Sequence, residues 1–262
     1  MSKLTSLITG ASGGIGLEIA KLHAADKYDL LLVARNETNL LRIKKELEAL
    51  HGITVHVFVT DLTVEENVKS VIEFTEKNNI KIDHLVNNAG IGVFGKLHET
   101  TLEDNLKMMD LNNRALVILT HHYVKLMAKH GTGKVLNIAS TAAFMPGPYM
   151  SIYFASKAFV LSFSEAIHSE LEGTGVTVTA LCPGPTNTGF VAAADGMQDS
   201  GLFSKQKVST PKEVALDGYK AMMNGESLRI SGMFNKISVF STRFSPRSWV
   251  TAMTKSITKP NS

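Results

Sequence analysis

The sequence predicts an α/β fold in which a doubly wound parallel sheet of about seven strands is covered by helices on both faces. Short apolar runs alternate with longer segments of helical periodicity along most of the chain. The short runs are apolar at successive positions, which is typical of strands buried on both sides. Gly52 and Gly131 follow two of the longer segments, at the position where glycine commonly ends a helix. Together these observations favour a parallel sheet between two layers of helices.

The individual elements can be assigned in order from the same patterns. The runs predicted as strands are 4–10, 30–35, 54–61, 82–90, 134–140 and 176–184. The segments predicted as helices are 16–27, 39–52, 64–79, 101–129 and 151–172. A further helix is expected to begin after Thr210, since the residues at 210–213 form a capping box with proline in the first turn.

Length and composition predict a single dinucleotide-binding and catalytic domain over residues 1–262. With 44% hydrophobic and 19% charged residues, the chain resembles a folded globular protein rather than a disordered one. No repeat or linker interrupts the pattern. Within the domain we expect a substrate lid and the last strand in 190–232, and a basic segment in 233–262.

The composition also restricts location and partners. No apolar run reaches the roughly 18 residues that a membrane-spanning helix needs. Leu4 already belongs to a strand pattern, which leaves no room for a cleavable signal before the fold. The single cysteine, Cys182, cannot form an internal disulfide and suits a reducing compartment. We therefore expect a cytoplasmic protein, and the small net charge of +3 does not indicate a nucleic-acid partner.

The C-terminal segment has an uneven charge. No acidic residue follows Glu226, whereas six basic residues do: Arg229, Lys236, Arg243, Arg247, Lys255 and Lys259. Phenylalanine, tryptophan, isoleucine and methionine lie between them, a composition that suits an acidic partner or peripheral contact with an anionic membrane. A solvated helix edge or a subunit contact is the preferred interpretation.

A glycine-rich turn joins the first predicted strand to the first helix. In the stretch 9–16, TGASGGIG, Gly10, Gly14 and Gly16 allow a sharp turn and close approach of the backbone to a diphosphate. The following helix N-terminus offers unpaired N–H groups to the anion. Glycines also collect in turns for conformational reasons alone. The strand–turn–helix context nevertheless favours a dinucleotide site and a three-layer Rossmann fold.

The end of the second predicted strand indicates which dinucleotide is bound. An acidic residue there usually holds a ribose 2′-hydroxyl. This chain has Ala34 followed by Arg35, so no carboxylate repels a 2′-phosphate and a guanidinium is available to bind one. The sequence therefore predicts NADP(H) as cofactor, although Arg35 as an ordinary surface arginine is the alternative.

Tyr153 and Lys157 lie four residues apart in a predicted helix, so both side chains share one face. A free phenol titrates near pH 10, and a nearby ammonium is expected to lower its pKa and suit it to acid–base work. Such a pair alone is more often a packed tyrosine beside a lysine. Ser140 ends the fifth predicted strand at the edge where ligands bind, and the three residues together favour an oxidoreductase site.

These motifs resemble those of the short-chain dehydrogenase/reductase family over at least residues 3–190. The matching stretches are TGASGGIG, Asp61, NNAG at 87–90, Asn112, Ser140, YFASK and PGPTNT at 183–188. The resemblance implies a homodimer or homotetramer, with the two long helices forming the interface. One position departs from the family pattern, because NNRA stands around Asn112.

The resemblance also implies a set of cofactor contacts. Asp61 would contact the adenine, Asn88 would line the groove, Lys157 would bond the nicotinamide ribose and Thr188 the carboxamide. The complete predicted set is Gly10, Ser12, Gly13, Gly14, Ile15, Gly16, Arg35, Asp61, Leu62, Asn88, Ala89, Gly90, Tyr153, Lys157, Pro183, Gly184, Thr186 and Thr188.

The implied catalytic residues are Tyr153, Lys157, Ser140 and Asn112. Tyr153 would donate the proton and Ser140 would orient the carbonyl. Asn112, or alternatively Asn113, would anchor a water that relays protons to Lys157. Ser140 and Tyr153 would also contact the substrate.

The substrate pocket is expected to be apolar. Phe144 and Tyr149 are predicted substrate-binding residues, and Met145 and Pro146 are expected in the same wall. The segment 190–210 is expected to act as a mobile lid. No metal site is predicted, since no histidines have the His-Glu-x-x-His spacing, the adjacent His121 and His122 do not share a helical face, and Cys182 has no suitable neighbour.

The predicted function is NADPH-dependent, reversible reduction of a ketone or aldehyde carbonyl in an apolar small molecule. Hydride would pass to the carbonyl carbon while Tyr153 protonates the developing alkoxide. Two alternatives remain at this point. One is a catalytically silent NADP-binding redox sensor, and the other is a membrane-associated lipid or sterol keto-reductase.

Overall fold

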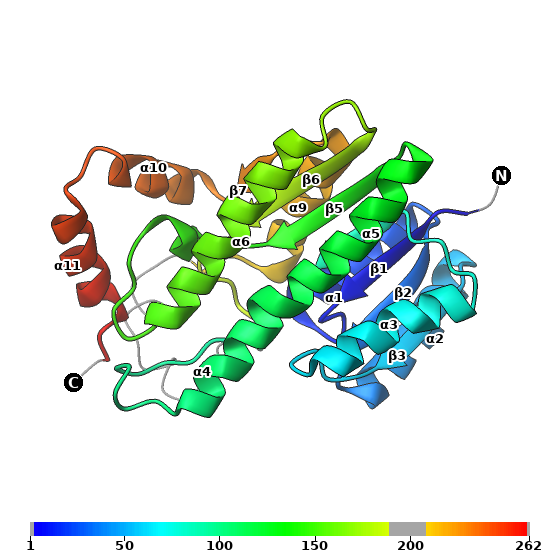
Figure 1. Ribbon diagram of the computed structural model, residues 1–262, viewed down its shortest axis with the longest axis horizontal. Helices are drawn as coiled ribbons and strands as arrows, with labels where there is room; N and C mark the ends of the chain where they lie inside the picture. Colours follow the sequence, from blue (N-terminus) through cyan, green and yellow to red (C-terminus); the bar gives the residue numbers. More distant parts are fainter. Residues whose placement is uncertain (1–2, 189–207, 261–262) are drawn as a thin grey trace.

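The computed structural model describes residues 3–188 and 208–260, which form a seven-stranded sheet with every strand pair parallel. The strands are β1 (Thr5–Thr9), β2 (Asp29–Ala34), β3 (Val55–Val59), β4 (His84–Asn87), β5 (Gly133–Ile138), β6 (Val176–Cys182) and β7 (Leu228–Ile230). Their order in the sheet is β3-β2-β1-β4-β5-β6-β7 (Figure 1). The predicted doubly wound parallel sheet is confirmed.

Helices cover both faces of the sheet. One layer contains α1 (Gly14–Ala25), α2 (Glu37–His51) and α9 (Pro211–Asn224), and the other contains α3 (Glu65–Lys77), α5 (Leu116–His130) and α6 (Ser151–Glu170). Successive strand residues point to opposite faces. Accordingly, Ile8 and Leu32 are buried with α1, α2 and α9, whereas Leu7 and Leu31 are buried with α3 and α5.

The winding of the sheet reverses between β1 and β4. From β1 the chain continues to β2 and β3 on one side, and it then crosses to β4 on the other. Ligands of open parallel sheets bind at such a reversal, beside the carboxyl ends of the strands. The segments that follow β1 and β4 meet there. The side-chain amide of Asn88 donates to the carbonyl oxygens of Thr9 (2.9 Å) and Gly10 (3.2 Å).

The predicted helix over 101–129 is not continuous. It consists of α4 (Leu102–Met109), a π-helical turn (Asp110–Ala115) and α5. The wider turn contains Asn112 and Asn113, and both side chains reach α6: the Asn113 amide donates to the Ser156 carbonyl oxygen at 3.0 Å, and the Asn112 amide to the Ser156 hydroxyl at 3.1 Å. Single π-helical turns of this kind are frequent at functional sites.

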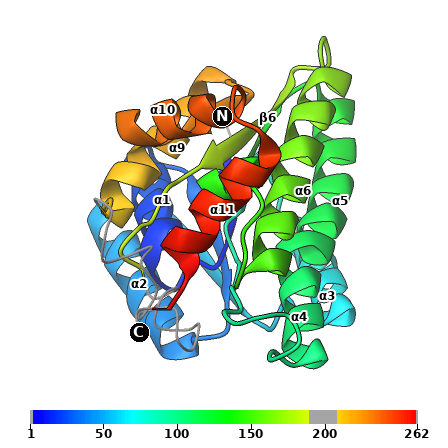
Figure 2. The same ribbon diagram turned by 90° about the vertical axis from the view of Figure 1, so that its left-hand side faces the viewer.

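The predicted basic segment 233–262 forms two helices, α10 (Met233–Thr242) and α11 (Arg247–Thr258). Figure 2 shows α11 lying in front of the carboxyl edge of the sheet. Of the predicted lid and last-strand region 190–232, residues 190–207 lie outside the described residues, and the remainder contains α9 and β7. Over 3–188 and 208–260, no helix is long and apolar enough to cross a membrane.

Candidate active site

The glycine-rich turn has the backbone geometry that anion binding requires. Gly10 and Gly14 have φ of +65° and +57°, a conformation that side chains disfavour. A Cβ on Gly16 would lie 2.5 Å from the Gly10 carbonyl oxygen, so this glycine permits packing of the turn. Within the described chain no side chain caps the N-terminus of α1. Its first N–H groups and the positive end of its dipole can therefore bind a phosphate.

Arg35 and Asp61 follow β2 and β3 and line the same cavity as the glycine-rich turn. The Arg35 guanidinium is 3.9 Å from the Asp61 carboxylate, and the arginine side chain is 70% exposed. Both residues line the cavity together with Leu62. This long contact between exposed groups is weak, so it does not prevent Arg35 from binding a phosphate.

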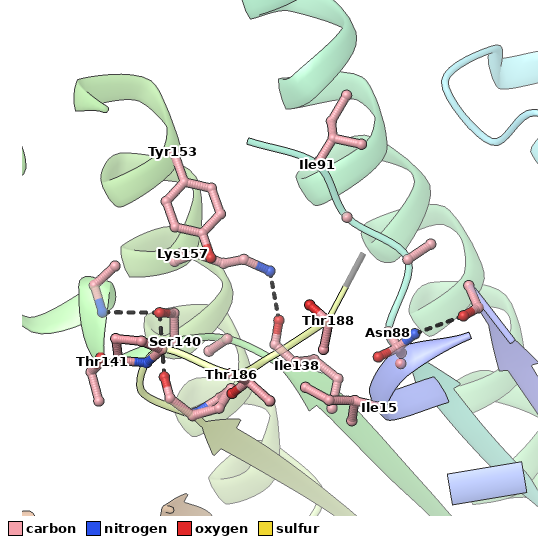
Figure 3. A pocket seen from close by; sticks show the side chains of 18 of the residues that line it. Ile15, Asn88, Ile91, Ile138, Ser140, Thr141, Tyr153, Lys157, Thr186 and Thr188 are labelled. Atoms are coloured by element: carbon pink, nitrogen blue, oxygen red, sulfur yellow. Dashed lines mark hydrogen bonds between the residues drawn. The ribbon is translucent and has the colours of Figure 1, made fainter. Parts of the chain in front are cut away.

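Tyr153, Lys157 and Ser140 converge at the opposite end. Figure 3 shows Tyr153 and Lys157 extending from α6 on the same side, the tyrosine toward Ser140 and the lysine toward Ile138. The Lys157 ammonium lies 5.8 Å from the centre of the tyrosine ring and donates to the Ile138 carbonyl oxygen at 2.8 Å. The Ser140 hydroxyl accepts from the Ala142 N–H at 3.1 Å. A hydrogen bond also joins the side chains of Ser140 and Tyr153.

Burial dominates the ionisation of this group. It raises the pKa of Tyr153 to about 12, although the hydrogen bond with Ser140 acts in the opposite direction. Burial also lowers the pKa of Lys157 to about 8. The expectation that the lysine lowers the phenol pKa is therefore wrong for the protein alone, because desolvation of the phenolate is the larger effect. A neutral phenol in this position is suited to donate a proton.

Asn112 is buried behind the lysine and does not line the cavity. Its amide nitrogen donates to the Ile91 carbonyl oxygen, and its amide oxygen accepts from the Ile91 N–H, both at 3.0 Å. A Cβ built on Gly90 would lie 3.1 Å from the Asn112 oxygen and 3.6 Å from the Lys157 ammonium. Asn112 is thus a neighbour of Lys157 that fixes the loop after β4, and its proposed relay role stays a prediction, as does that of Asn113.

One cavity of about 740 Å³ contains most of the predicted site residues. Its lining includes Gly10, Ser12, Gly13, Gly14, Ile15, Arg35, Asp61, Leu62, Asn88, Ala89, Gly90, Ser140, Tyr153, Lys157, Pro183, Gly184, Thr186 and Thr188. Gly16 is a packing residue just outside the lining. Among the described residues no cluster of histidine, cysteine, aspartate and glutamate could hold a metal ion.

The predicted apolar wall needs correction. Phe144 packs against the hydrophobic cluster around Val160, and Tyr149 stacks on Phe94 with ring centres 6.2 Å apart. Neither is part of the cavity lining in the described chain, whereas Met145 and Met150 are. Phe144 ends the 3₁₀ turn that follows β5 (Thr141–Phe144), and Met145 is the next residue.

The C-terminal helices complete the wall, which the sequence did not predict. The residues concerned are Phe234, Asn235, Ser238 and Val239 of α10, and Met253 and Ile257 of α11. Asn235 and Ser238 make this face of α10 partly polar, so its hydrophobic pattern gives no clear signal of a pocket. The amide of Asn235 donates to the Ser231 carbonyl oxygen at 2.7 Å, and this side chain packs closely on Gly184.

The arrangement is that of a known enzyme family. A model of the short chain dehydrogenase family matches residues 5–199. The chain belongs to the short-chain dehydrogenase family. A relative, sulfoacetaldehyde reductase 2 of Chromohalobacter salexigens, is 32% identical over 90% of this chain and 94% of that protein.

Solved structures of other short-chain dehydrogenases agree with this assignment. A Sphingobium yanoikuyae short-chain dehydrogenase in complex with NADPH is 30% identical, with a TM-score of 0.80 over 92% of this chain and 93% of that chain. A 7β-hydroxysteroid dehydrogenase structure is 26% identical, with a TM-score of 0.86 over 96% of both chains. The family match stops at residue 199. The part of the wall formed by α10 and α11 therefore lies outside the residues that the family model matches.

Proposed function

We propose that this short-chain dehydrogenase is an NADP(H)-dependent reductase that converts the carbonyl group of an apolar ketone or aldehyde to an alcohol, reversibly. One observation carries the proposal. A single cavity holds a phosphate-binding turn and Arg35 at one end, and Tyr153, Lys157 and Ser140 at the other, under an apolar wall. An oxidoreductase of this family needs both ends within the reach of one dinucleotide.

The cofactor assignment rests on the end of β2. Arg35 there can make charge-assisted hydrogen bonds to a 2′-phosphate, and Ala34 leaves no carboxylate to repel it. The turn at Gly10 and Gly14 leaves backbone room for the diphosphate. The similar Sphingobium yanoikuyae enzyme was solved with NADPH, which agrees with this choice. When bound, the reduced nicotinamide supplies the hydride.

The lining near Tyr153 favours an apolar substrate. Met145, Met150, Phe154 and Ile257 belong to this lining, and Lys157 is the cation at this end among the described residues. A sulfonated aldehyde, the substrate named for the relative from Chromohalobacter salexigens, would find no other positive partner there. A hydrocarbon-rich ketone, as the hydroxysteroid-dehydrogenase neighbour suggests, fits the wall better.

The chain's own residues position the carbonyl and supply its proton. Ser140 is close enough to Tyr153 for both hydroxyls to hydrogen-bond one substrate oxygen. As hydride reaches the carbonyl carbon, the electron pair of the C=O bond moves to this oxygen. The neutral Tyr153 hydroxyl then transfers its proton to the forming alkoxide. Lys157 places positive charge beside the phenolate that remains.

A carbonyl panel assayed by NADPH consumption tests the proposal. The Tyr153→Phe variant should lose roughly 10²- to 10⁴-fold in turnover, the usual contribution of a general acid, while NADPH binding is retained. Tyr149→Phe is the matched control, because this tyrosine stacks on Phe94 outside the cavity lining. It should keep wild-type turnover.

Two outcomes would contradict the proposal. Unchanged turnover in Tyr153→Phe would show that another group donates the proton. Tight NADPH binding by the wild type without turnover of any carbonyl in the panel would instead favour a redox sensor.

A further inference from the structure

Helix α10 exposes its apolar side chains to solvent. Met233, Ile237 and Phe240 are spaced by four and three residues, so they lie on one face of the helix, and Phe244 continues the stripe just beyond it. These four side chains are between 59% and 76% exposed. A contiguous apolar surface rimmed by polar groups usually marks a binding site.

The opposite face of α10 is mostly polar. Asn235, Ser238 and Thr242 are half-buried on this side, and Val239 is the buried hydrophobic residue of the helix. A surface helix of a globular protein normally has the reverse orientation, with its apolar face toward the core. Burial in this protein therefore does not explain the apolar stripe, and a partner outside the described chain would explain it.

The charges around the stripe indicate the partner's chemistry. Five exposed cations lie on or beside the two helices: Lys236, Arg243, Arg247, Lys255 and Lys259. None forms an ion pair with another residue in the described ranges, whereas Arg229 pairs with Glu226. No acidic residue follows Glu226 in the sequence. Trp249, which is 72% exposed, adds a large aromatic side chain at the start of α11.

We propose that α10 and the start of α11 form a docking surface for an anionic lipid bilayer. Exposed phenylalanine and tryptophan among lysine and arginine is the composition of helices that lie in a membrane interface. A second copy related by a two-fold axis would bring this cationic surface against itself, with unfavourable repulsion. A purely acidic protein surface would satisfy the cations but would leave the apolar stripe exposed.

The docking surface lies on the same helices that form part of the cavity wall, so docking would affect the proposed function. Ser238 and Val239 of α10 and Ile257 of α11 line the catalytic cavity. Docking would thus hold the wall of the cavity beside the bilayer, where apolar ketones dissolve. This consequence rests on the proposed reductase activity, whereas docking itself does not. Docking is tested by vesicle binding and not by turnover, so a negative result for docking is distinguishable from failure of the reductase proposal.

Trp249 makes the docking directly measurable, because it is the only tryptophan in the sequence. The full chain is mixed with vesicles of phosphatidylcholine alone, or of phosphatidylcholine and phosphatidylglycerol in equal parts. With the anionic vesicles we expect the tryptophan emission to move to shorter wavelength and the protein to co-sediment. With phosphatidylcholine alone we expect neither change.

The apolar contribution is tested by the double variant Ile237→Gln and Phe240→Gln. Both side chains point to solvent, so the variant should fold like the wild type. Loss of two large apolar groups from the membrane interface should weaken vesicle binding by more than roughly tenfold. An unchanged affinity would overturn the proposed insertion of the stripe.

The charge contribution is tested by the triple variant Lys236→Gln, Arg243→Gln and Arg247→Gln, because these exposed cations lie on α10, just after it and at the start of α11. Each cation near an anionic surface contributes about fivefold in affinity, so three should contribute roughly a hundredfold. The matched control replaces one exposed lysine on each of α2, α3 and α5, as Lys45→Gln, Lys77→Gln and Lys129→Gln. The control has the same net charge as the triple variant and should bind nearly as tightly as the wild type.

Three further results would overturn the proposal. One is equal loss of binding in the triple variant and its control, which would indicate an effect of net charge alone. Another is vesicle binding without any change in tryptophan emission, which would indicate a purely electrostatic contact. The third is a dimer, measured by light scattering, that the double variant converts to monomer while vesicles have no effect on the wild type. That result would assign the surface to a second copy of the chain.

Discussion

Acidification is expected to destabilise the protein through two histidines buried far from the active site. His23 lies in the last turn of α1 and His84 begins β4, with ring centres 5.5 Å apart. Burial lowers the pKa of His23 to about 4 and that of His84 to about 3. In the unfolded chain both imidazoles titrate near pH 6.5. The folded state therefore binds fewer protons, and its stability falls as the pH drops below 6.5.

The size of the effect follows from these pKa values. One pKa unit corresponds to about 1.4 kcal/mol. The change for His23, from 6.5 to about 4, thus corresponds to about 3 kcal/mol of stability that is present above pH 6.5 and lost by pH 4. His84 contributes further, although part of its lowered pKa arises from the charge of His23. This loss is a large fraction of the roughly 5–15 kcal/mol that stabilises a typical protein.

Urea unfolding at several pH values between 6.5 and 4 measures this loss. The wild-type free energy of unfolding should fall by up to about 2.7 kcal/mol for each pH unit, the slope for uptake of two protons on unfolding. His23→Phe keeps an aromatic ring but cannot bind a proton, so this slope should fall by about half. His98→Gln, on an exposed side chain before α4, is the control and should leave the slope unchanged. The reasoning is refuted if His23→Phe shows the wild-type slope.

Three further predictions concern the cavity. Arg35→Ala should weaken NADPH binding by about 1.5–3 kcal/mol, the strength of a hydrogen bond to a charged group, and leave NADH binding almost unchanged; equal losses in titrations of both cofactors would contradict the assignment of NADP(H). Lys157 should lose its proton near pH 8 in the free enzyme. The pH profile of kcat/KM for reduction should therefore decline above pH 8, and a flat profile to pH 10 would argue against a required ammonium. Ile257→Ala should enlarge the cavity and raise kcat/KM for bulky over small ketones by roughly tenfold or more, and an unchanged ratio would show that α11 does not contact the substrate.

Much of the site could be predicted because it depends on local sequence. The turn at Gly10 and Gly14 requires a conformation that glycine adopts readily, and it follows a recognisable strand. Tyr153 and Lys157 share a helix face through their spacing alone, and Figure 3 shows both side chains extending from α6 on the same side. Parallel strands place their carboxyl ends at one edge, which brings Ser140 and the glycine turn together.

The remainder depends on effects that a sequence pattern does not contain. Whether the pKa of Tyr153 is raised or lowered depends on the relative sizes of the effects of burial and of neighbouring groups. The extent of burial is known only from the folded structure. The inward-facing residues after β5 depend on the irregular turn that ends at Phe144. The positions of α10 and α11 are set by contacts with the carboxyl edge, and the partly polar inner face of α10 gives no clear hydrophobic periodicity that points there.

The π-helical turn between α4 and α5 gives the long helix a register that a regular helix would not have. Hydrogen bonds in such a turn span five residues instead of four, so α4 and α5 are out of phase by about one residue. Deleting one residue within Asp110–Ala115 would restore regular winding and rotate α4 by about 100° relative to α5. Asn112 would then turn away from Ile91, and the loop after β4 would lose the two hydrogen bonds that join Ile91 to this side chain. The shortened chain would have a regular helix, but it would lose the hydrogen bonds that position the loop beside Lys157.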